Sequence, residues 1–193
     1  MEKLTLRDIK NIAEYEKERP AFFKHIVALK KRRRVSVGDK VTLVFENRDT
    51  VRFQIQEMCR VERIVHDEKI QEEVDVYNGL IPEPNHLAAT VFIEITDMKR
   101  IREILDTLIG LDEYIAIRLG EDQKIPAMFE PGRSREDRIA AVQYVSFQFS
   151  SKQIEMLKNP GIGAYLAINH PNYQEKVEIP PVIREELIRD WSS

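Results

Sequence analysis

Apolar residues recur with two different periods along this chain, and the change between them falls near residue 85. Before that point the apolar positions mostly follow a helical spacing of three and four residues. From residue 90 onwards, short alternating segments are separated by turns, which is the pattern of antiparallel strands. Because helices are gathered at the start and strands follow them, we expect an α+β fold with N-terminal helices packed on a mostly antiparallel sheet.

The length of the chain is that of one domain. Its 193 residues can bury a sufficient core without disulfides or a structural metal. We therefore predict a single domain over residues 1–193, helix-rich over 1–85 and sheet-rich over 86–193.

Caps and turn residues predict the boundaries of the individual elements. In the first half, the expected elements are a helix from Thr5 to Pro20, a second helix that begins at Pro20, a hairpin over 35–45, and helices over 50–65 and 67–77. In the second half, they are strands over 90–95, 114–118, 124–129, 142–149 and 164–168, and helices over 98–109, 151–159 and 181–191. Pro126 interrupts its strand, so we place that strand at a sheet edge.

Several functional classes are excluded by what the sequence lacks. No run of 18 apolar residues is present, which excludes a membrane-spanning helix, and the N-terminus has no apolar signal segment. The single cysteine, Cys59, is typical of a reducing compartment, so we expect a cytoplasmic location. The glycine-rich nucleotide motifs, zincin motifs, paired C-x-x-C sequences and the nucleophile elbow are also missing. Whether the protein is an enzyme stays open.

Positive charge is concentrated in the first third of the chain. Residues 1–65 hold 16 Lys or Arg against 10 Asp or Glu, whereas the whole chain has a net charge of −3. The basic run at residues 30–34 contacts nucleic-acid phosphates on one interpretation and closes a helix C-terminus on the other. No aromatic residue interleaves the run, and the pI is about 5.9. We therefore expect the helix-closing role and no nucleic-acid partner.

A polar stripe is predicted on the helix over residues 50–65. Arg52, Gln56, Arg60 and Arg63 fall on one face at helical spacing. Three guanidinium groups there would suit a carboxylate or phosphate ligand. The alternative that we favour is ion pairing with the acidic helix that follows, through Glu72, Glu73 and Asp75.

A second pattern on the same predicted helix suggests a metal. Cys59, Glu62 and His66 point in one direction on this helix, with Glu62 on the apolar stripe. These three side chains could bind a divalent metal together with ligands from elsewhere, and a buried carboxylate could also serve as a general acid or base. The alternative is an ordinary core cysteine beside a Glu62 that pairs with an arginine such as Arg48.

Two predicted loops also carry candidate functional residues. His170 and Tyr173 lie at the end of a predicted strand, where a rigid sheet often presents functional side chains, although a turn at Pro171 and Asn172 needs no function. The charged segment at 130–138 is either a solvated loop or one that orders over a ligand.

Particular segments of the chain resemble an uncharacterised bacterial family. They are Leu29-Lys-Lys-Arg-Arg-Arg-Val35, Phe45-Glu-Asn-Arg-Asp-Thr-Val-Arg-Phe-Gln-Ile-Gln-Glu-Met58, Glu62-Arg-Ile64, Tyr77-Asn78, Leu80-Ile-Pro82 and His170-Pro-x-Tyr173. The resemblance is to domain-of-unknown-function family 3501 and spans essentially the whole chain. The family pattern covers Arg48, Asp49, Gln54, Gln56, Glu57, Glu62 and Arg63. It does not include Cys59 or His66, which weakens the metal hypothesis.

The resemblance implies a biological setting but no reaction. Members of the family are often encoded beside a rubrerythrin and an iron–sulfur oxidoreductase subunit, which implies a role in peroxide defence or in iron and electron handling. Our first hypothesis is a non-catalytic accessory protein that binds an acidic redox partner or a small anion. The alternatives are a metal- or cofactor-dependent oxidoreductase that uses Glu62 with His66, Glu57 or His170, and nucleic-acid binding through residues 30–34.

Overall fold

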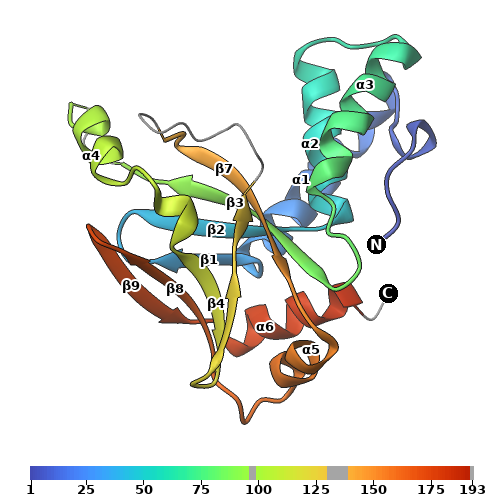
Figure 1. Ribbon diagram of the computed structural model, residues 1–193. Helices are drawn as coiled ribbons and strands as arrows, with labels where there is room; N and C mark the ends of the chain where they lie inside the picture. Colours follow the sequence, from blue (N-terminus) through green and yellow to red (C-terminus); the bar gives the residue numbers. More distant parts are fainter. Residues whose placement is uncertain (96–98, 130–138, 192–193) are drawn as a thin grey trace.

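The computed structural model describes residues 1–95, 99–129 and 139–191, and within these ranges the strands form two antiparallel sheets. In order across the sheet, the five-stranded one contains β1 (Arg34–Val37), β2 (Val41–Glu46), β3 (His86–Ile93), β7 (Val142–Gln148) and β6 (Met128–Phe129). The four-stranded one contains β5 (Gln123–Pro126), β4 (Ile115–Leu119), β8 (Ala164–His170) and β9 (Tyr173–Glu178). The expected α+β class and antiparallel pairing are confirmed (Figure 1).

The main hydrophobic core lies between the two sheets. Alternate residues of each strand face it, so Leu43 and Phe45 from β2 meet Ile117 from β4 and Leu166 from β8, all of them fully buried. The same alternation turns every second residue of β2 toward the opposite face of its sheet. The predicted hairpin is confirmed as the pair β1 and β2, whose register matches Val37 with Val41.

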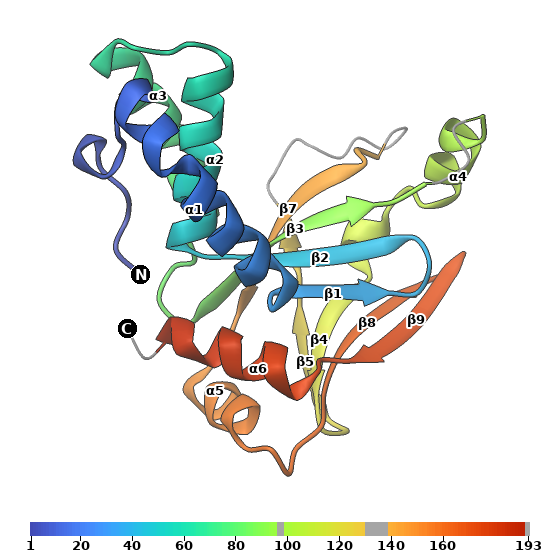
Figure 2. The same cartoon turned by 180° about the vertical axis from the view of Figure 1, so that it is seen from behind.

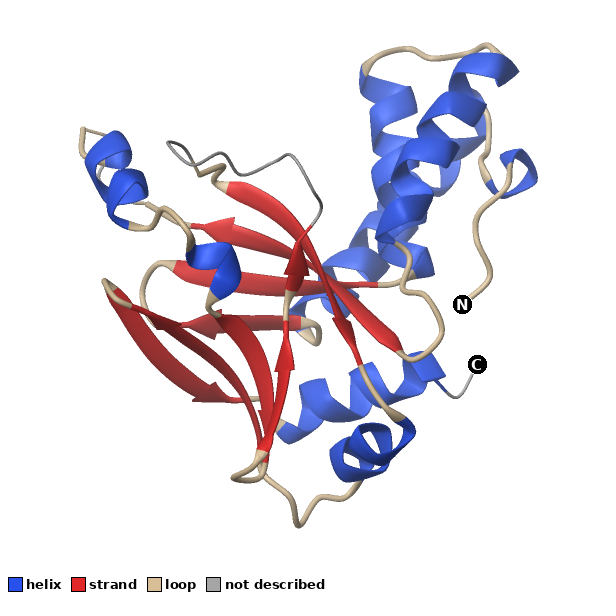
Figure 3. Ribbon diagram, viewed as in Figure 1, coloured by secondary structure: helices blue, strands red, loops and turns tan. Residues whose placement is uncertain are grey.

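Three helices, α1 (Ile12–Lys31), α2 (Arg48–Val61) and α3 (Asp67–Tyr77), form a group that we call the helical lobe. Figure 2 shows α1 lying beside α2, and Figure 3 shows the lobe standing at one end of the sheets. A second hydrophobic cluster joins α2 to α3 within the lobe and contains Val51, Ile55, Cys59, Ile70 and Val74. No helix in the described part of the chain is long and apolar enough to cross a membrane.

Short elements connect and cover the sheets. They are α4 (Ile101–Thr107), α5 (Ser151–Lys158), α6 (Pro181–Ile188) and the 3₁₀ helices η1 (Leu6–Asp8), η2 (Asn78–Leu80), η3 (Leu111–Glu113) and η4 (Arg189–Trp191). The α5 helix is capped by Ser150, whose hydroxyl accepts a hydrogen bond from the Gln153 backbone N–H. Arg184 of α6 joins the two helices, because its guanidinium donates to the carbonyl oxygens of Met156 (2.9 Å), Asn159 (2.6 Å) and Ile162 (2.7 Å).

The predicted break at Pro20 is wrong. The α1 helix runs through this residue from Ile12 to Lys31, and its cap is Asn11, whose side chain accepts a hydrogen bond from the Glu14 amide. The residues near Thr5 form only the 3₁₀ turn η1. A proline inside a helix costs one backbone hydrogen bond and crowds the preceding turn. Here Pro20 lies on the exposed side of the helix, while Tyr15, Ile26 and Leu29 are buried and hold both halves in place.

Two predictions about the strands also change. Residues 124–129 do not form one strand: after Pro126 the chain leaves the four-stranded sheet and continues as β6 at the edge of the five-stranded sheet. The β9 strand was not predicted, because its central residues Gln174, Glu175 and Lys176 are exposed polar residues at a sheet edge. The predicted helix over 98–109 is observed as α4, and Met98 lies outside the described residues.

Candidate functional site

The arginine stripe of α2 faces α1. Arg60 pairs with Glu57 at 3.1 Å and with Glu16 of α1 at 3.8 Å. The predicted pairing with Glu72, Glu73 and Asp75 of α3 is therefore wrong for Arg60. The reason is that α3 packs on the apolar side of α2, through Ile70 and Val74, and leaves the polar side to α1.

Glu57 is the centre of the contacts between α1 and α2. Its carboxylate accepts hydrogen bonds from Arg19 Nε (2.8 Å), from Arg60 Nη2 (3.1 Å) and from the Tyr15 hydroxyl (2.7 Å). Hydrogen bonds from Arg19, Arg60 and Tyr15 outweigh partial burial and lower the pKa of Glu57 to about 2. The charge of Glu57 is thus balanced within the lobe, which makes this residue a structural link between the two helices.

Gln56 is also occupied by contacts within the chain. It is 3% exposed, and its side-chain amide accepts from the Lys10 backbone N–H (2.8 Å) and donates to the Lys10 carbonyl (3.0 Å). This pair of hydrogen bonds holds the segment before α1 against α2. Gln56 therefore shapes the surface beside it, and one donor and one acceptor position of its amide are used within the chain.

Arg52 lies at a cavity of about 420 Å³ between residues 8–10, α1 and α2. Its guanidinium sits 4.6 Å from the centroid of the Phe22 ring, a cation–π contact that holds the group in place. Its ion pair with Asp49 is long, at 3.7 Å, and its buried Nε has no hydrogen-bond partner among the described residues. Arg52 therefore keeps hydrogen-bonding capacity that no described residue uses.

The charges around this cavity do not cancel. Lys10 pairs with Glu18, and Arg48 pairs with Asp8 at 2.6 Å. Lys17 also lines the cavity and forms no ion pair with any residue of the described ranges. Together with the loosely paired Arg52, Lys17 leaves this region, which we call the Arg52 cavity, with a positive surplus.

Sequence reasoning did not find the part of the Arg52 cavity that α1 supplies. Lys17 and Ala21 are four residues apart and so share one face of α1. This spacing could have identified the face of α1 that carries Lys17, but only the packing of the two helices decides that this face lies against α2. Arg63 belongs elsewhere, because it is exposed, lies beyond the end of α2 and lines a different hollow with Arg60.

The residues proposed for a metal are not brought together. The α2 helix ends at Val61, Glu62 caps it, and Arg63 takes a left-handed backbone conformation with φ of 54°. The chain therefore turns before His66, which instead begins α3. No group of three or more His, Cys, Asp or Glu residues that could hold a metal ion occurs within residues 1–95, 99–129 and 139–191.

The structure also shows what each of the proposed metal ligands Cys59 and Glu62 does. Glu62 is exposed and does not lie on the apolar stripe, and its expected partner Arg48 pairs with Asp8. Cys59 is 1% exposed, and burial raises the pKa of its thiol. Cys59 therefore acts as an apolar core residue, as the alternative interpretation proposed.

His170 is buried, and backbone groups use both of its ring nitrogens. Nε2 lies 3.0 Å from the Ile109 carbonyl, to which it donates, and Nδ1 accepts from the Asn172 backbone N–H at 3.2 Å. The ring also packs edge-on against Tyr114. These contacts assign the neutral tautomer with the proton on Nε2. They make His170 a link between the end of β8 and the segment before β4.

Tyr173 joins β9 to the hairpin of β1 and β2. Its hydroxyl donates to the Val37 carbonyl (2.6 Å) and accepts from the Lys40 backbone N–H (3.0 Å). Gly38, with φ of 70°, lies directly beneath this hydroxyl, and a Cβ atom there would overlap it. Tyr173 therefore serves packing between the two sheets and is not presented to solvent.

We expect replacement of His170 by leucine to lower the free energy of unfolding by about 1–3 kcal/mol, because the Ile109 carbonyl and the Asn172 N–H lose their partner. Chemical denaturation at neutral pH measures this change. The matched control is His66→Leu, at an exposed histidine without a side-chain capping bond, which should change stability by less than about 0.5 kcal/mol. Equal stability of the two variants would contradict the structural role.

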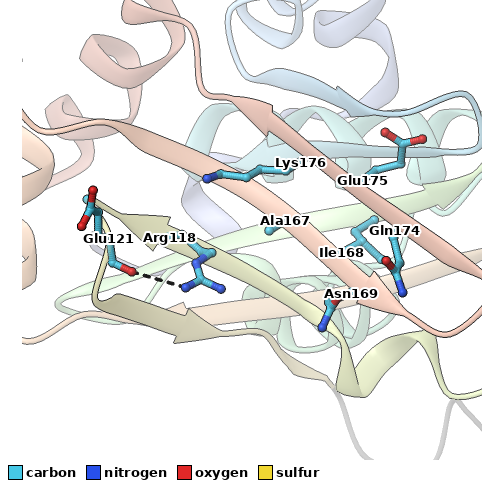
Figure 4. A pocket seen from close by; sticks show the side chains of 9 residues that line it. Arg118, Glu121, Ala167, Ile168, Asn169, Gln174, Glu175 and Lys176 are labelled. Atoms are coloured by element: carbon cyan, nitrogen blue, oxygen red, sulfur yellow. Dashed lines mark hydrogen bonds between the residues drawn. The ribbon is translucent and has the colours of Figure 1, made fainter.

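The outer face of the four-stranded sheet carries a second polar hollow, of about 590 Å³ (Figure 4). Ala167 lies in its middle, and Arg118, Asn169, Gln174 and Lys176 surround it. Arg118 donates weakly to the Glu121 carbonyl at 3.4 Å, and Lys176 covers the Tyr165 ring at 4.1 Å. Glu121 and Glu175 are among the lining residues as well as Arg118 and Lys176, so the formal charges of the lining residues balance.

The basic run at residues 30–34 does not form one surface. Lys30 and Lys31 lie in the last turn of α1, the helix-closing position that was favoured. Beyond the helix, Arg32 pairs with Glu186, Arg33 is fully buried, and Arg34 pairs with Glu94. The charged segment at 130–138 lies outside the described residues.

Comparison with known proteins gives a family and a fold. The model of a family described as "Protein of unknown function (DUF3501)" matches residues 3–191. A crystal structure of a novel protein of unknown function from Burkholderia pseudomallei K96243 is 29% identical and covers 98% of this chain and 99% of its own, with a TM-score of 0.91. No curated protein matches the chain.

Proposed function

The chain belongs to the DUF3501 family of proteins of unknown function, and we propose from its own geometry that it is an accessory protein that binds a carboxylate or phosphate group in the Arg52 cavity. The observation that carries this proposal is the state of Arg52. Its guanidinium is held by Phe22, reaches Asp49 only at 3.7 Å, and lines a cavity with the unpaired Lys17. A planar guanidinium with free donors suits a carboxylate or phosphate group, which can accept two hydrogen bonds at once.

The anionic group has two sources, a small molecule or an acidic side chain of a protein partner. The family resemblance implies a rubrerythrin or an iron–sulfur oxidoreductase subunit as that partner, and a cytoplasmic role in peroxide defence or in iron and electron handling. Both protein classes are therefore the first partners to test. A single domain over residues 1–193 is part of the same proposal. The oxidoreductase alternative gains no support from the geometry, because Glu62 and His66 lie on opposite sides of the turn that ends α2.

The test replaces Arg52 by methionine, which keeps an unbranched apolar stem against Phe22 and removes the charge. Calorimetric titration at low salt uses citrate and phosphate as small-molecule probes, and purified rubrerythrin and iron–sulfur subunit as protein probes. We expect at least one probe to bind, and Arg52→Met to weaken its binding about tenfold or more, since a hydrogen bond to a charged group contributes about 1.5–3 kcal/mol.

The matched control is Arg63→Met, at an exposed arginine outside the Arg52 cavity, which should change the affinity less than about twofold. Weakening that is seen only with a protein probe identifies an acidic partner, and weakening with citrate or phosphate identifies a small anion. Equal affinities of the Arg52 and Arg63 variants, or binding of none of the four probes, would refute the proposal.

A further inference from the structure

Glu46, the last residue of β2, is a buried carboxylate that has no counter-charge among the described residues. It is 2% exposed, and its oxygens accept hydrogen bonds from the hydroxyls of Thr50 and Thr90 (2.6 Å for Thr90) and from the Gln54 amide (3.2 Å). All three donors are neutral. No Lys, Arg or His of the described ranges forms an ion pair with it.

The nearest buried cation is already used. The Arg33 guanidinium donates to the backbone carbonyls of Phe45 (2.8 Å) and Glu46 (3.1 Å), and its charge is balanced by Asp190 and Glu186. A buried carboxylate is costly unless it is paired, and neutral hydrogen bonds repay only part of that cost. A cation bound beside Glu46 would therefore gain an attraction that no cation of the described residues uses.

Glu46 also lines a cavity of about 300 Å³ between the outer face of the five-stranded sheet and η2. The other walls are mostly apolar and come from Leu80, Ala88, Met128, Phe129, Tyr144 and Ser146. The cavity thus combines one buried carboxylate with apolar walls, which is the usual composition of a site for a small molecule with a single charged group. Among the described residues that line it, none belongs to α2 or to the Arg52 cavity, and the one that is charged is a carboxylate.

We propose that this cavity, the Glu46 cavity, binds a small molecule that carries a protonated amine on an apolar body. From the described residues, Glu46 Oε1 accepts only the Thr90 hydrogen bond, which leaves a lone pair for an ammonium donor. The Thr50 hydroxyl and the Gln54 amide donate to the other oxygen, Oε2, so they do not compete with an ammonium group at Oε1. The apolar body then packs between Leu80 and Met128, where it is removed from water.

The test compares two probes of the same shape, hexylamine and 1-hexanol, at pH 7 by NMR titration and calorimetry. We expect the wild-type protein to bind hexylammonium at least tenfold more tightly than hexanol. Glu46→Gln keeps the size and most hydrogen bonds of the side chain, and it should remove that preference while hexanol binding stays within about twofold. Equal binding of the two probes by the wild-type protein, absence of binding, or an unchanged preference in Glu46→Gln would overturn the proposal.

A second variant keeps the test decisive if Glu46→Gln fails to fold. Ser146→Leu extends a partly exposed side chain into the cavity from β7 and leaves the Glu46 hydrogen bonds intact. With circular dichroism showing a folded protein, this variant should bind both probes at least tenfold more weakly. Wild-type affinity for hexylammonium in a folded Ser146→Leu protein would place the amine elsewhere and refute the assignment.

Discussion

Replacement of Arg33 by methionine is expected to lower the free energy of unfolding by about 3–5 kcal/mol, the range measured when one partner of a buried ion pair is removed. The Arg33 side chain is fully buried, and it connects the end of α1 to the end of β2 and to the C-terminal η4. Without it, Glu186 keeps Arg32 and Arg189, whereas Asp190 loses its guanidinium partner in a buried position. Urea denaturation at pH 7 measures the change.

The neighbouring Arg34→Met variant provides the control. Arg34 pairs with Glu94 at the surface, where both side chains are nearly half exposed, so its loss should cost less than about 1 kcal/mol. Burial raises the pKa of Asp190, and the hydrogen bond from Arg33 opposes that rise. Without Arg33 the folded protein takes up a proton at Asp190 more readily than the unfolded chain, so the deficit of Arg33→Met should shrink as the pH falls. Similar stabilities of the two variants at pH 7 would contradict the role of Arg33.

A second large effect is expected at Glu57. Its pKa in the folded protein is about 2, against an ordinary value of 4.5, so the unfolded chain binds the proton more tightly. The resulting stabilisation is fully present above about pH 4.5 and is lost as the pH falls toward 2. One pKa unit corresponds to 1.36 kcal/mol, and the shift therefore contributes about 3 kcal/mol. We expect Glu57→Gln to lower the free energy of unfolding at pH 7 by about 2–3 kcal/mol.

The pH profile separates this charge effect from a general loss of packing. The difference between the wild-type protein and Glu57→Gln should narrow below pH 4.5, because acid removes the same charge from the wild-type protein. The control is Glu72→Gln, at a carboxylate that is 62% exposed and pairs with Lys69, and it should change stability by less than about 1 kcal/mol. A Glu57→Gln deficit that stays constant from pH 7 to pH 3 would show that the charge is not responsible.

The sequence correctly predicted those elements whose signals are local. The α3 and α5 helices and the hairpin follow from caps and turns within about four residues, as the Ser150 and Gln153 pair shows. A local cap likewise begins α2, where the Asn47 side chain accepts a hydrogen bond from the Thr50 backbone N–H. The end of α2 was missed because the helical period continues past Val61 in the sequence, while the folded chain turns at the left-handed Arg63.

The candidate sites were predicted only in part, because sequence spacing relates only residues that are close along the chain. Helical spacing identified Arg52 and Gln56 as members of one polar face, but it did not identify α1 as the element that meets that face. Glu46 was not identified as a site residue, because its position is that of an ordinary last residue of a strand. Thr90, whose hydroxyl donates a hydrogen bond to it, lies 44 residues further along the chain. No spacing rule connects residues that far apart.

The sequence by itself determined the α+β class, the antiparallel strands and most helix starts, because these depend on periodicity and on hydrogen bonds between near neighbours. The tertiary structure alone decided that Arg33 is buried against Asp190, 157 residues away, and that Glu57 is neutralised by α1. It also decided that the proposed metal ligands lie apart and that Glu46 faces an apolar cavity. Charged side chains have many partners available along a chain, and only the packing of distant elements selects among them.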